Sequence, residues 1–283
     1  MSVSDSQKAD ILVQALPYIQ RYNGEILVVK YGGNAMINPE LVDCVMKDIV
    51  LLNQIGVKVV LVHGGGPEIS EMLKRVGKET KFINGLRQTD KETAEIVQMV
   101  LCGKINKNLV GIINRMGGHA MGLSGFDDGL IKAEKINEEL GFVGEVKEIK
   151  AKPVIDLLDR GYIPVVSSVG YDEDGNVYNI NADTVASSLA AELKAGSLIS
   201  MTDIKGILRD KNDDSSLIPV ITVDEAPALI ESGVINGGMI PKVNCCIDAI
   251  KGGVKRVFII DGRVPHSILI EVLSDEGIGT MFH

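Results

Sequence analysis

The chain has 283 residues, of which 45% are hydrophobic and 24% are charged, and its formal net charge at pH 7 is −9. This balance is typical of a soluble globular protein with one large core or two lobes. The acidic charge excludes nonspecific nucleic-acid binding, which needs a basic surface. No apolar run approaches the roughly 18 residues of a membrane span, and the first residues show no targeting pattern. We therefore expect a cytoplasmic protein without membrane contact.

The segment 1–22 predicts a kinked helix. Its apolar residues recur at helical spacing, at Ile11, Leu12, Ala15, Leu16 and Ile19. Pro17 falls inside this pattern and is expected to kink the helix. Such a helix either lies on its own domain or is exchanged with another subunit. The spacing alone favours a helix that lies on its own domain.

Apolar, β-branched runs alternate with longer stretches of helical period along the rest of the chain. This alternation predicts an α/β fold, with an open, mostly parallel central sheet sandwiched by helices. The predicted strands are Ile26–Lys30, Lys58–Val62, Ile163–Ser167, Ser197–Met201 and Arg256–Ile260. The predicted helices include Pro39–Gln54 and the unusually long Thr89–Met116. Short alternating runs over 120–149 predict β-hairpins that line or cover a site.

Two of the predicted strands end on glycine-rich turns. The first ends on Lys30 and continues into Gly32 and Gly33, and the second is followed by His63 and the run 64–66, which is all glycine. Glycine lets main-chain N–H groups approach an anion without a Cβ in the way. Two such turns side by side, with a lysine beside them, predict a phosphate-binding site.

Two further polar motifs each precede a helical stretch in the second half of the chain. Asn179 and Asn181 lead to Asp183, and two glycines at 237 and 238 lead to Lys242. Asn181 or Asp183 is the expected cap of its helix. Lys242 is either a solvated charge or a phosphate ligand at a helix N-terminus. The turn-rich residues 171–178 predict a hinge between two lobes.

In this order, these motifs resemble those of the amino-acid kinase family, over nearly the whole chain. The segments that carry the resemblance are Lys30–Met36, His63–Pro67, Gly85–Thr89 and Asn179–Asp183. They are most similar to the members that act on N-acetyl-L-glutamate. The resemblance implies a kinase domain over 23–283, with about 23–175 as the acceptor-binding and dimerisation lobe and about 176–283 as the ATP-binding lobe. The β-hairpins are expected over the acceptor site.

The resemblance implies transfer of the γ-phosphoryl group of ATP to a carboxylate. Lys30 and Lys242 are the expected catalytic lysines, and Asp183 is expected to orient both ammonium groups. An ionised carboxylate needs no general base, so catalysis is expected to rest on positioning and charge neutralisation. His63 is therefore expected to be structural.

The resemblance also assigns the binding residues. Those for the acceptor, N-acetyl-L-glutamate, are Gly65, Gly66, Arg87 and Asn179. Arginine offers a planar fork that suits a carboxylate, and an asparagine amide suits the N-acetyl group. Those for ATP and its phosphates are Gly32, Gly33, Asp203 and Gly238. Mg²⁺ is expected to be carried on the nucleotide, with no metal site built from protein carboxylates alone.

The N-terminal helix and the C-terminal segment resemble the arginine-inhibited branch of the family. Glu271, Gly277 and Lys205 are the expected arginine-binding residues, and Tyr18 is a weaker candidate. In that branch the N-terminal helices interlace dimers into a hexamer. The resemblance thus implies a homo-oligomer, a trimer of dimers. It favours an N-terminal helix exchanged with another subunit over one that lies on its own domain.

Three other functions remain open from the sequence. One is a related kinase that forms an acyl phosphate on another acceptor, such as aspartate, glutamate, carbamate or uridylate. Another is a catalytically silent arginine-binding relative. The third, a dinucleotide-dependent oxidoreductase, is disfavoured because Ile69 stands where its third glycine is required.

Overall fold

The computed structural model describes residues 4–275 and 277–283. Its central element is an eight-stranded sheet with the strand order β12-β14-β13-β11-β1-β2-β8-β5. All neighbouring pairs are parallel except β13 and β14. The strands are β1 Ile26–Tyr31, β2 Lys58–His63, β5 Ala120–Leu123, β8 Ile163–Ser167, β11 Ser197–Thr202, β12 Val220–Ile221, β13 Arg256–Asp261 and β14 Thr280–Phe282. The predicted α/β fold with a mostly parallel sheet is confirmed.

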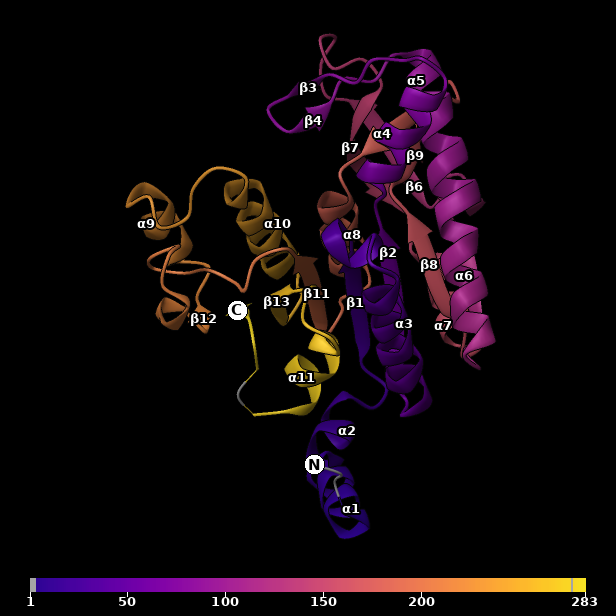
Figure 1. Ribbon diagram of the computed structural model, residues 1–283. Helices are drawn as coiled ribbons and strands as arrows, with labels where there is room; N and C mark the ends of the chain where they lie inside the picture. The colour runs from indigo at the N-terminus through magenta and orange to yellow at the C-terminus, as the bar shows by residue number, and fades with distance from the viewer. Residues whose placement is uncertain (1–3, 276) are drawn as a thin grey trace.

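Helices cover both faces of this sheet (Figure 1). One core holds side chains of α3 Pro39–Gln54, α4 Gly66–Arg75, α5 Lys91–Gln98, α6 Asn106–Arg115 and α11 Ser267–Leu273. The other holds side chains of α7 Lys152–Leu158, α8 Ala182–Glu192, α9 Ala226–Glu231 and α10 Met239–Lys251. Along β1, Leu27 and Val29 belong to the first core and Val28 to the second. Because both faces are buried, such strands are continuous apolar runs in the sequence.

The long helix predicted over 89–116 is present. It consists of α5, a π-helical segment Met99–Ile105 and α6. By length and composition alone, Lys91–Arg115 could cross a membrane, which corrects the expectation that no segment could. Here its side chains Val97, Leu101 and Ile113 are fully buried in the core against the sheet.

The N-terminal segment forms two helices, α1 Asp5–Gln14 and α2 Leu16–Tyr22. Pro17 lies in the first turn of α2, just past the break between the two helices, and residues 1–3 of the predicted segment lie outside the described residues. However, α1 extends away from the remaining structure (Figure 1) and buries none of its described residues. The expectation from spacing, a helix lying on its own domain, is therefore wrong for α1. Its apolar residues Leu12 and Val13 are 72% and 68% exposed.

A small closed barrel with the strand order β10-β7-β6-β9 stands beside the main sheet. Its strands are β6 Ile131–Lys135, β7 Val143–Ile149, β9 Val169–Tyr171 and β10 Val177–Ile180. Strands β6 and β7 form one of the predicted hairpins. Strand β5, predicted as part of a hairpin, instead pairs in parallel with β8 at the edge of the main sheet. Only Ala120 of this edge strand is buried, and Met121 is exposed.

The predicted hinge at 171–178 is a tight hairpin turn between β9 and β10. Asp172 closes it by accepting hydrogen bonds from the main-chain N–H groups of Asp174 and Asn176 and from the hydroxyl of Tyr178. A second short hairpin pairs β3 Phe82–Ile83 with β4 Leu86–Arg87. Single 3₁₀ turns occur at Gly33–Met36, Asp127–Gly129 and Asp214–Ser216.

Candidate active site

The two glycine turns lie side by side. Strands β1 and β2 are parallel neighbours, and Tyr31 pairs in register with His63. The main-chain N–H of Gly64 donates to the carbonyl of Tyr31 over 3.3 Å. The carboxyl ends of both strands therefore open on one common edge, which is where ligands bind in open parallel sheets.

Three charged side chains from three elements meet beside these turns. Asp183 Oδ1 lies 3.2 Å from Lys30 Nζ, and Asp183 Oδ2 lies 2.7 Å from Lys242 Nζ. Lys30 comes from β1, Asp183 from the first turn of α8 and Lys242 from the first turn of α10. Asn181, and not Asp183, caps α8, because its side chain accepts from the N–H of Asp183 over 2.8 Å. The Asp183 carboxylate is thus available to both lysines.

The electrostatics of this triad favour an anion. Burial alone would raise the pKa of Asp183, but the two neighbouring ammonium groups outweigh burial and bring that pKa to about 2. Burial would lower the pKa of Lys242, yet Asp183 raises it, whereas burial prevails at Lys30 and lowers its pKa. Two cations around one ionised carboxylate leave one positive charge uncompensated. A phosphoryl group fits that charge.

The glycines approach the triad closely. A Cβ added at Gly32 would lie 3.1 Å from Lys30 Nζ. Gly33 has a φ of +68°, and a Cβ there would lie 2.7 Å from a carboxylate oxygen of Asp203, just beyond the end of β11. Position 33 therefore requires glycine both for its left-handed backbone and for this contact. Gly238 caps α10, with open space around the place of its missing Cβ.

The predicted acceptor residues line one cavity of about 180 Å³, formed by the second glycine turn, Arg87 on β4, Asn179 on β10 and the start of α8. Arg87 is only 6% exposed. Its guanidinium donates to the Gly66 carbonyl and the Ser70 hydroxyl, both over 2.9 Å, and to Thr80 over 3.2 Å. The side-chain amide of Asn179 donates to the Thr89 hydroxyl over 3.4 Å.

A second cavity of about 550 Å³ adjoins the first. It is lined by Asp183, Lys242 and Gly238, and it shares Gly85, Leu86 and Asn181 with the first cavity. Asp183 and Lys242 thus line a cavity that borders the one lined by Arg87 and Asn179. Two adjoining cavities are what in-line transfer between two bound molecules requires.

His63 is held as a neutral, structural side chain. It is fully buried, its Nδ1 lies 2.9 Å from the Gly64 carbonyl, and its Nε2 lies 3.2 Å from the Asn106 amide. Burial lowers its pKa to about 4. A carbonyl accepts only from a protonated nitrogen, so Nδ1 carries the proton and Nε2 accepts from Asn106.

Ser200 and Met201 of β11 hydrogen-bond to members of the triad, and sequence reasoning missed both. The Ser200 hydroxyl donates to Asp183 Oδ1 over 3.0 Å, and Lys30 Nζ donates to the Met201 carbonyl over 3.4 Å. No motif marks a serine inside a buried strand. The pairing of Lys30 with Ser200 across β1 and β11 is the signal that reveals it.

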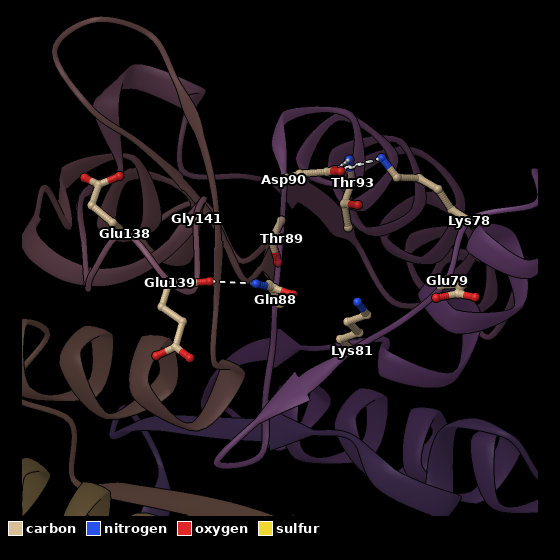
Figure 2. Close-up of a pocket in the computed structure, with 10 residues that line it drawn as sticks. All are labelled: Lys78, Glu79, Lys81, Gln88, Thr89, Asp90, Thr93, Glu138, Glu139 and Gly141. Atoms are coloured by element: carbon tan, nitrogen blue, oxygen red, sulfur yellow. Dashed lines mark hydrogen bonds and ion pairs between the residues drawn. The ribbon is translucent and has the colours of Figure 1, made fainter.

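A cavity of about 370 Å³ lies away from the triad (Figure 2). Figure 2 shows Gln88 bridging to the carbonyl of Glu139 and Lys78 reaching Asp90. Its lining mixes lysines and carboxylates and includes none of the predicted site residues. We assign it no role in the chemistry.

The structure brings together some of the predicted arginine-binding residues. Glu271 accepts from the main-chain N–H groups of Ile278 and Gly279 over 2.8 and 3.2 Å. A Cβ at Gly277 would lie 2.9 Å from a carboxylate oxygen of Glu271. Lys205 instead pairs with Asp214 over 2.6 Å. Asp275, near the Glu271 segment, raises the pKa of Tyr18 of α2.

Comparison with known proteins agrees with this geometry. Residues 25–261 match the sequence profile of the Amino acid kinase family. The acetylglutamate kinase of Brachyspira hyodysenteriae is 53% identical over 100% of this chain and 99% of its own length. That of Heliobacterium modesticaldum is 53% identical over 97% of both chains.

Solved structures share the fold. The N-acetylglutamate synthase of Neisseria gonorrhoeae superposes with a TM-score of 0.85 at 24% identity, covering 97% of this chain and 63% of that chain. The carbamate kinase of Giardia lamblia superposes with a TM-score of 0.67 at 18% identity, covering 92% of this chain and 98% of that chain. At these identities the likeness establishes the fold alone.

Proposed function

The chain belongs to the amino acid kinase family and is an enzyme, and on that premise we propose that it phosphorylates N-acetyl-L-glutamate with ATP in arginine biosynthesis. The product is N-acetyl-L-glutamyl 5-phosphate. The observation that carries the proposal is the triad, in which Lys30 and Lys242 share the carboxylate of Asp183. Asp183 and Lys242 line a cavity that adjoins the one lined by Arg87 and Asn179.

The catalytic roles follow from the charges of the triad. Lys30 holds the phosphoryl group from the acceptor side and Lys242 from the nucleotide side. Asp183 keeps both ammonium groups aimed at one point without taking a proton, because its pKa of about 2 leaves it ionised at neutral pH. The acceptor carboxylate is itself ionised and needs no base. Main-chain N–H groups at Gly32, Gly33 and the second turn add stabilisation, worth about 3 kcal/mol per donor in other enzymes.

The acceptor cavity suits an acid without an ammonium group. Among the described residues that line it, none is acidic, whereas a free amino acid would call for a carboxylate partner. Arg87 is assigned to the α-carboxylate and Asn179 to the N-acetyl amide, with main-chain contacts from Gly65 and Gly66. Because Arg87 already holds the Gly66 carbonyl, it also fixes the second glycine turn.

The nucleotide is assigned to the cavity beside Lys242, with contacts from Gly238 and from Asp203 next to Gly33. Among the described residues, no group of three or more His, Cys, Asp or Glu side chains is placed to hold a metal ion. We assign Mg²⁺ to the ATP phosphates, whose charge it would neutralise. We retain the division near residue 175 into an acceptor lobe and an ATP lobe as part of the proposal.

Arginine inhibition and a hexamer belong to the same proposal. Support for an arginine site comes from Glu271 and Gly277, which lie against each other at the end of α11, with α2 packed against this helix. Support for a trimer of dimers comes from the exposed apolar residues of α1. Arginine is expected to move the N-acetyl-L-glutamate saturation curve to higher concentration, and an unmoved curve removes the inhibition from the proposal.

The activity is tested by trapping acyl phosphate with hydroxylamine. ATP is supplied with N-acetyl-L-glutamate, L-glutamate or L-aspartate in separate reactions, and the hydroxamate is measured. We expect product with the acetylated acid only. Product with glutamate or aspartate and none with the acetylated acid would refute the substrate assignment. No product with any acceptor would favour a catalytically silent arginine-binding protein.

A further inference from the structure

The face of the sheet that supports the triad ends in two polar side chains. Strands β1 and β11 are parallel neighbours, and Lys30 pairs in register with Ser200. Two residues earlier, Val28 and Leu198 face the core under α8. Because side chains alternate along a strand, Lys30 and Ser200 emerge on that same face, one step beyond the apolar core. Asp183, in the first turn of α8, lies above both.

Ser200 has a defined partner in this position. Ser200 is only 6% exposed, and its Oγ lies 3.0 Å from Asp183 Oδ1. Oδ1 therefore receives Ser200 and Lys30, while Oδ2 receives Lys242. The lysines approach on long, flexible side chains, whereas the hydroxyl is one bond from the Cβ of a rigid strand.

This difference decides what orients the carboxylate. A carboxylate that holds two mobile cations can rotate about its last torsion, since that torsion is broad. A third, short and rigid donor fixes its plane. With the plane fixed, Oδ1 faces Lys30 and Oδ2 faces Lys242, so both ammonium groups keep one common target.

We propose that Ser200 is a positioning residue of phosphoryl transfer, whose hydroxyl fixes the Asp183 carboxylate so that Lys30 and Lys242 converge on the transferred group. The proposal rests on the proposed function, since it assigns Ser200 to the same triad. Ser200 lines neither of the two cavities assigned to the substrates. Its effect on the reaction passes entirely through Asp183.

Ser197 supplies a matched comparison on the same strand. It is 1% exposed, and within the described residues its Oγ has no hydrogen-bond partner. Strand β11 thus carries two buried hydroxyl groups, of which only one reaches the triad. Removing each separates the loss of a buried hydroxyl from the loss of the contact with Asp183.

The test compares Ser200→Ala, Ser200→Thr and Ser197→Ala in the hydroxamate reaction. We expect Ser200→Ala to lower kcat about tenfold, equivalent to about 1.4 kcal/mol, with both KM values within twofold of wild type. Ser200→Thr keeps the hydroxyl and is expected to recover most of kcat, and Ser197→Ala is expected to match wild type. A kcat within twofold of wild type in Ser200→Ala, or an equal loss in Ser197→Ala, would overturn the proposal.

A second measurement does not depend on turnover. The ¹³C signal of the Asp183 carboxylate is followed between pH 3 and pH 6 in wild type and Ser200→Ala. We expect protonation of Asp183 to begin at a higher pH in the variant than in wild type, because a hydrogen bond to the ionised form has been lost. Identical titrations contradict the positioning role. A wild-type protein without phosphoryl transfer refutes the proposed function instead.

Discussion

Replacing Asp183 by asparagine tests whether the triad is a buried, charge-coupled unit. The change keeps the shape of the side chain but removes the negative charge between two ammonium groups. The side chains of Lys30, Asp183 and Lys242 are 10%, 12% and 21% exposed, so little solvent is present to screen the change. Removing one partner of a buried ion pair costs about 3–5 kcal/mol.

The pKa of Asp183 gives an independent magnitude. A decrease from the usual 3.8 to about 2 corresponds to about 2.4 kcal/mol of folding stability at neutral pH. Because the carboxyl pKa is depressed in the folded state, this stability is present above about pH 4 and is lost as the pH falls towards 2. We expect Asp183→Asn to lower the free energy of unfolding by about 3 kcal/mol at pH 7. At pH 3 the difference in free energy of unfolding between wild type and Asp183→Asn is expected to be about 1 kcal/mol smaller than at pH 7.

Urea denaturation followed by circular dichroism at pH 7 and pH 3 measures both quantities. The control is Asp156→Asn, which breaks the exposed pair with Lys152, where Asp156 is 56% exposed. That change is expected to have little effect, because surface ion pairs contribute little. Equal stability of wild type and Asp183→Asn at pH 7, or a gap that is the same at both pH values, would refute this reasoning.

Three further changes probe the surrounding site and core. Arg87→Lys removes the planar guanidinium and is expected to raise KM for the acceptor at least about tenfold, while KM for ATP stays constant. Initial rates at varied concentrations of each substrate measure both KM values. An unchanged acceptor KM would show that Arg87 does not bind the acceptor. Gly33→Ala and Gly77→Ala both place a side chain at a positive φ, so each is expected to lower the free energy of unfolding by about 1 kcal/mol. Gly33→Ala is expected to lower it further, because only there would the added Cβ meet the carboxylate of Asp203. Denaturant titrations measure both changes. Equal losses would show that this contact is unimportant. Burial raises the pKa of Asp48 to about 6, so the free energy of unfolding of wild type is expected to fall by up to about 3 kcal/mol as the pH rises from 4 to above 6. Asp48→Asn is expected to make this fall smaller. The same pH dependence of the free energy of unfolding in both proteins would contradict the prediction.

The sheet could be predicted because its strands are buried on both faces. Continuous β-branched runs such as Ile26–Lys30 have few other fates, and the glycines that follow mark the strand ends. Strand β5 was misjudged because Ala120–Leu123 is short and contains glycine, like a hairpin strand. The exposure of α1 could not be predicted, since helical spacing identifies an apolar face but not what covers it.

The triad shows a similar limit. That Asp183 meets Lys30 and Lys242 was expected from a resemblance to a family, since 153 and 59 residues of separation carry no local signal. Ser200 was missed because its partner depends on the register between β1 and β11. Asn181 and Asp183 were equal candidates for the cap of α8, and only the side-chain geometry distinguishes them.

In the proposed function Lys30 and Lys242 together hold the transferred phosphoryl group, and we call this pair of contacts the two-lysine clamp. Its most direct test is the single-turnover rate of acyl phosphate formation in Lys242→Ala. The matched control is Lys251→Ala, which changes an exposed lysine at the other end of the same helix. The clamp predicts a rate at least about 100-fold lower in Lys242→Ala, from the loss of a charge that acts on the transferred group, and a normal rate in Lys251→Ala. A rate within twofold of wild type in a folded Lys242→Ala protein would contradict the clamp.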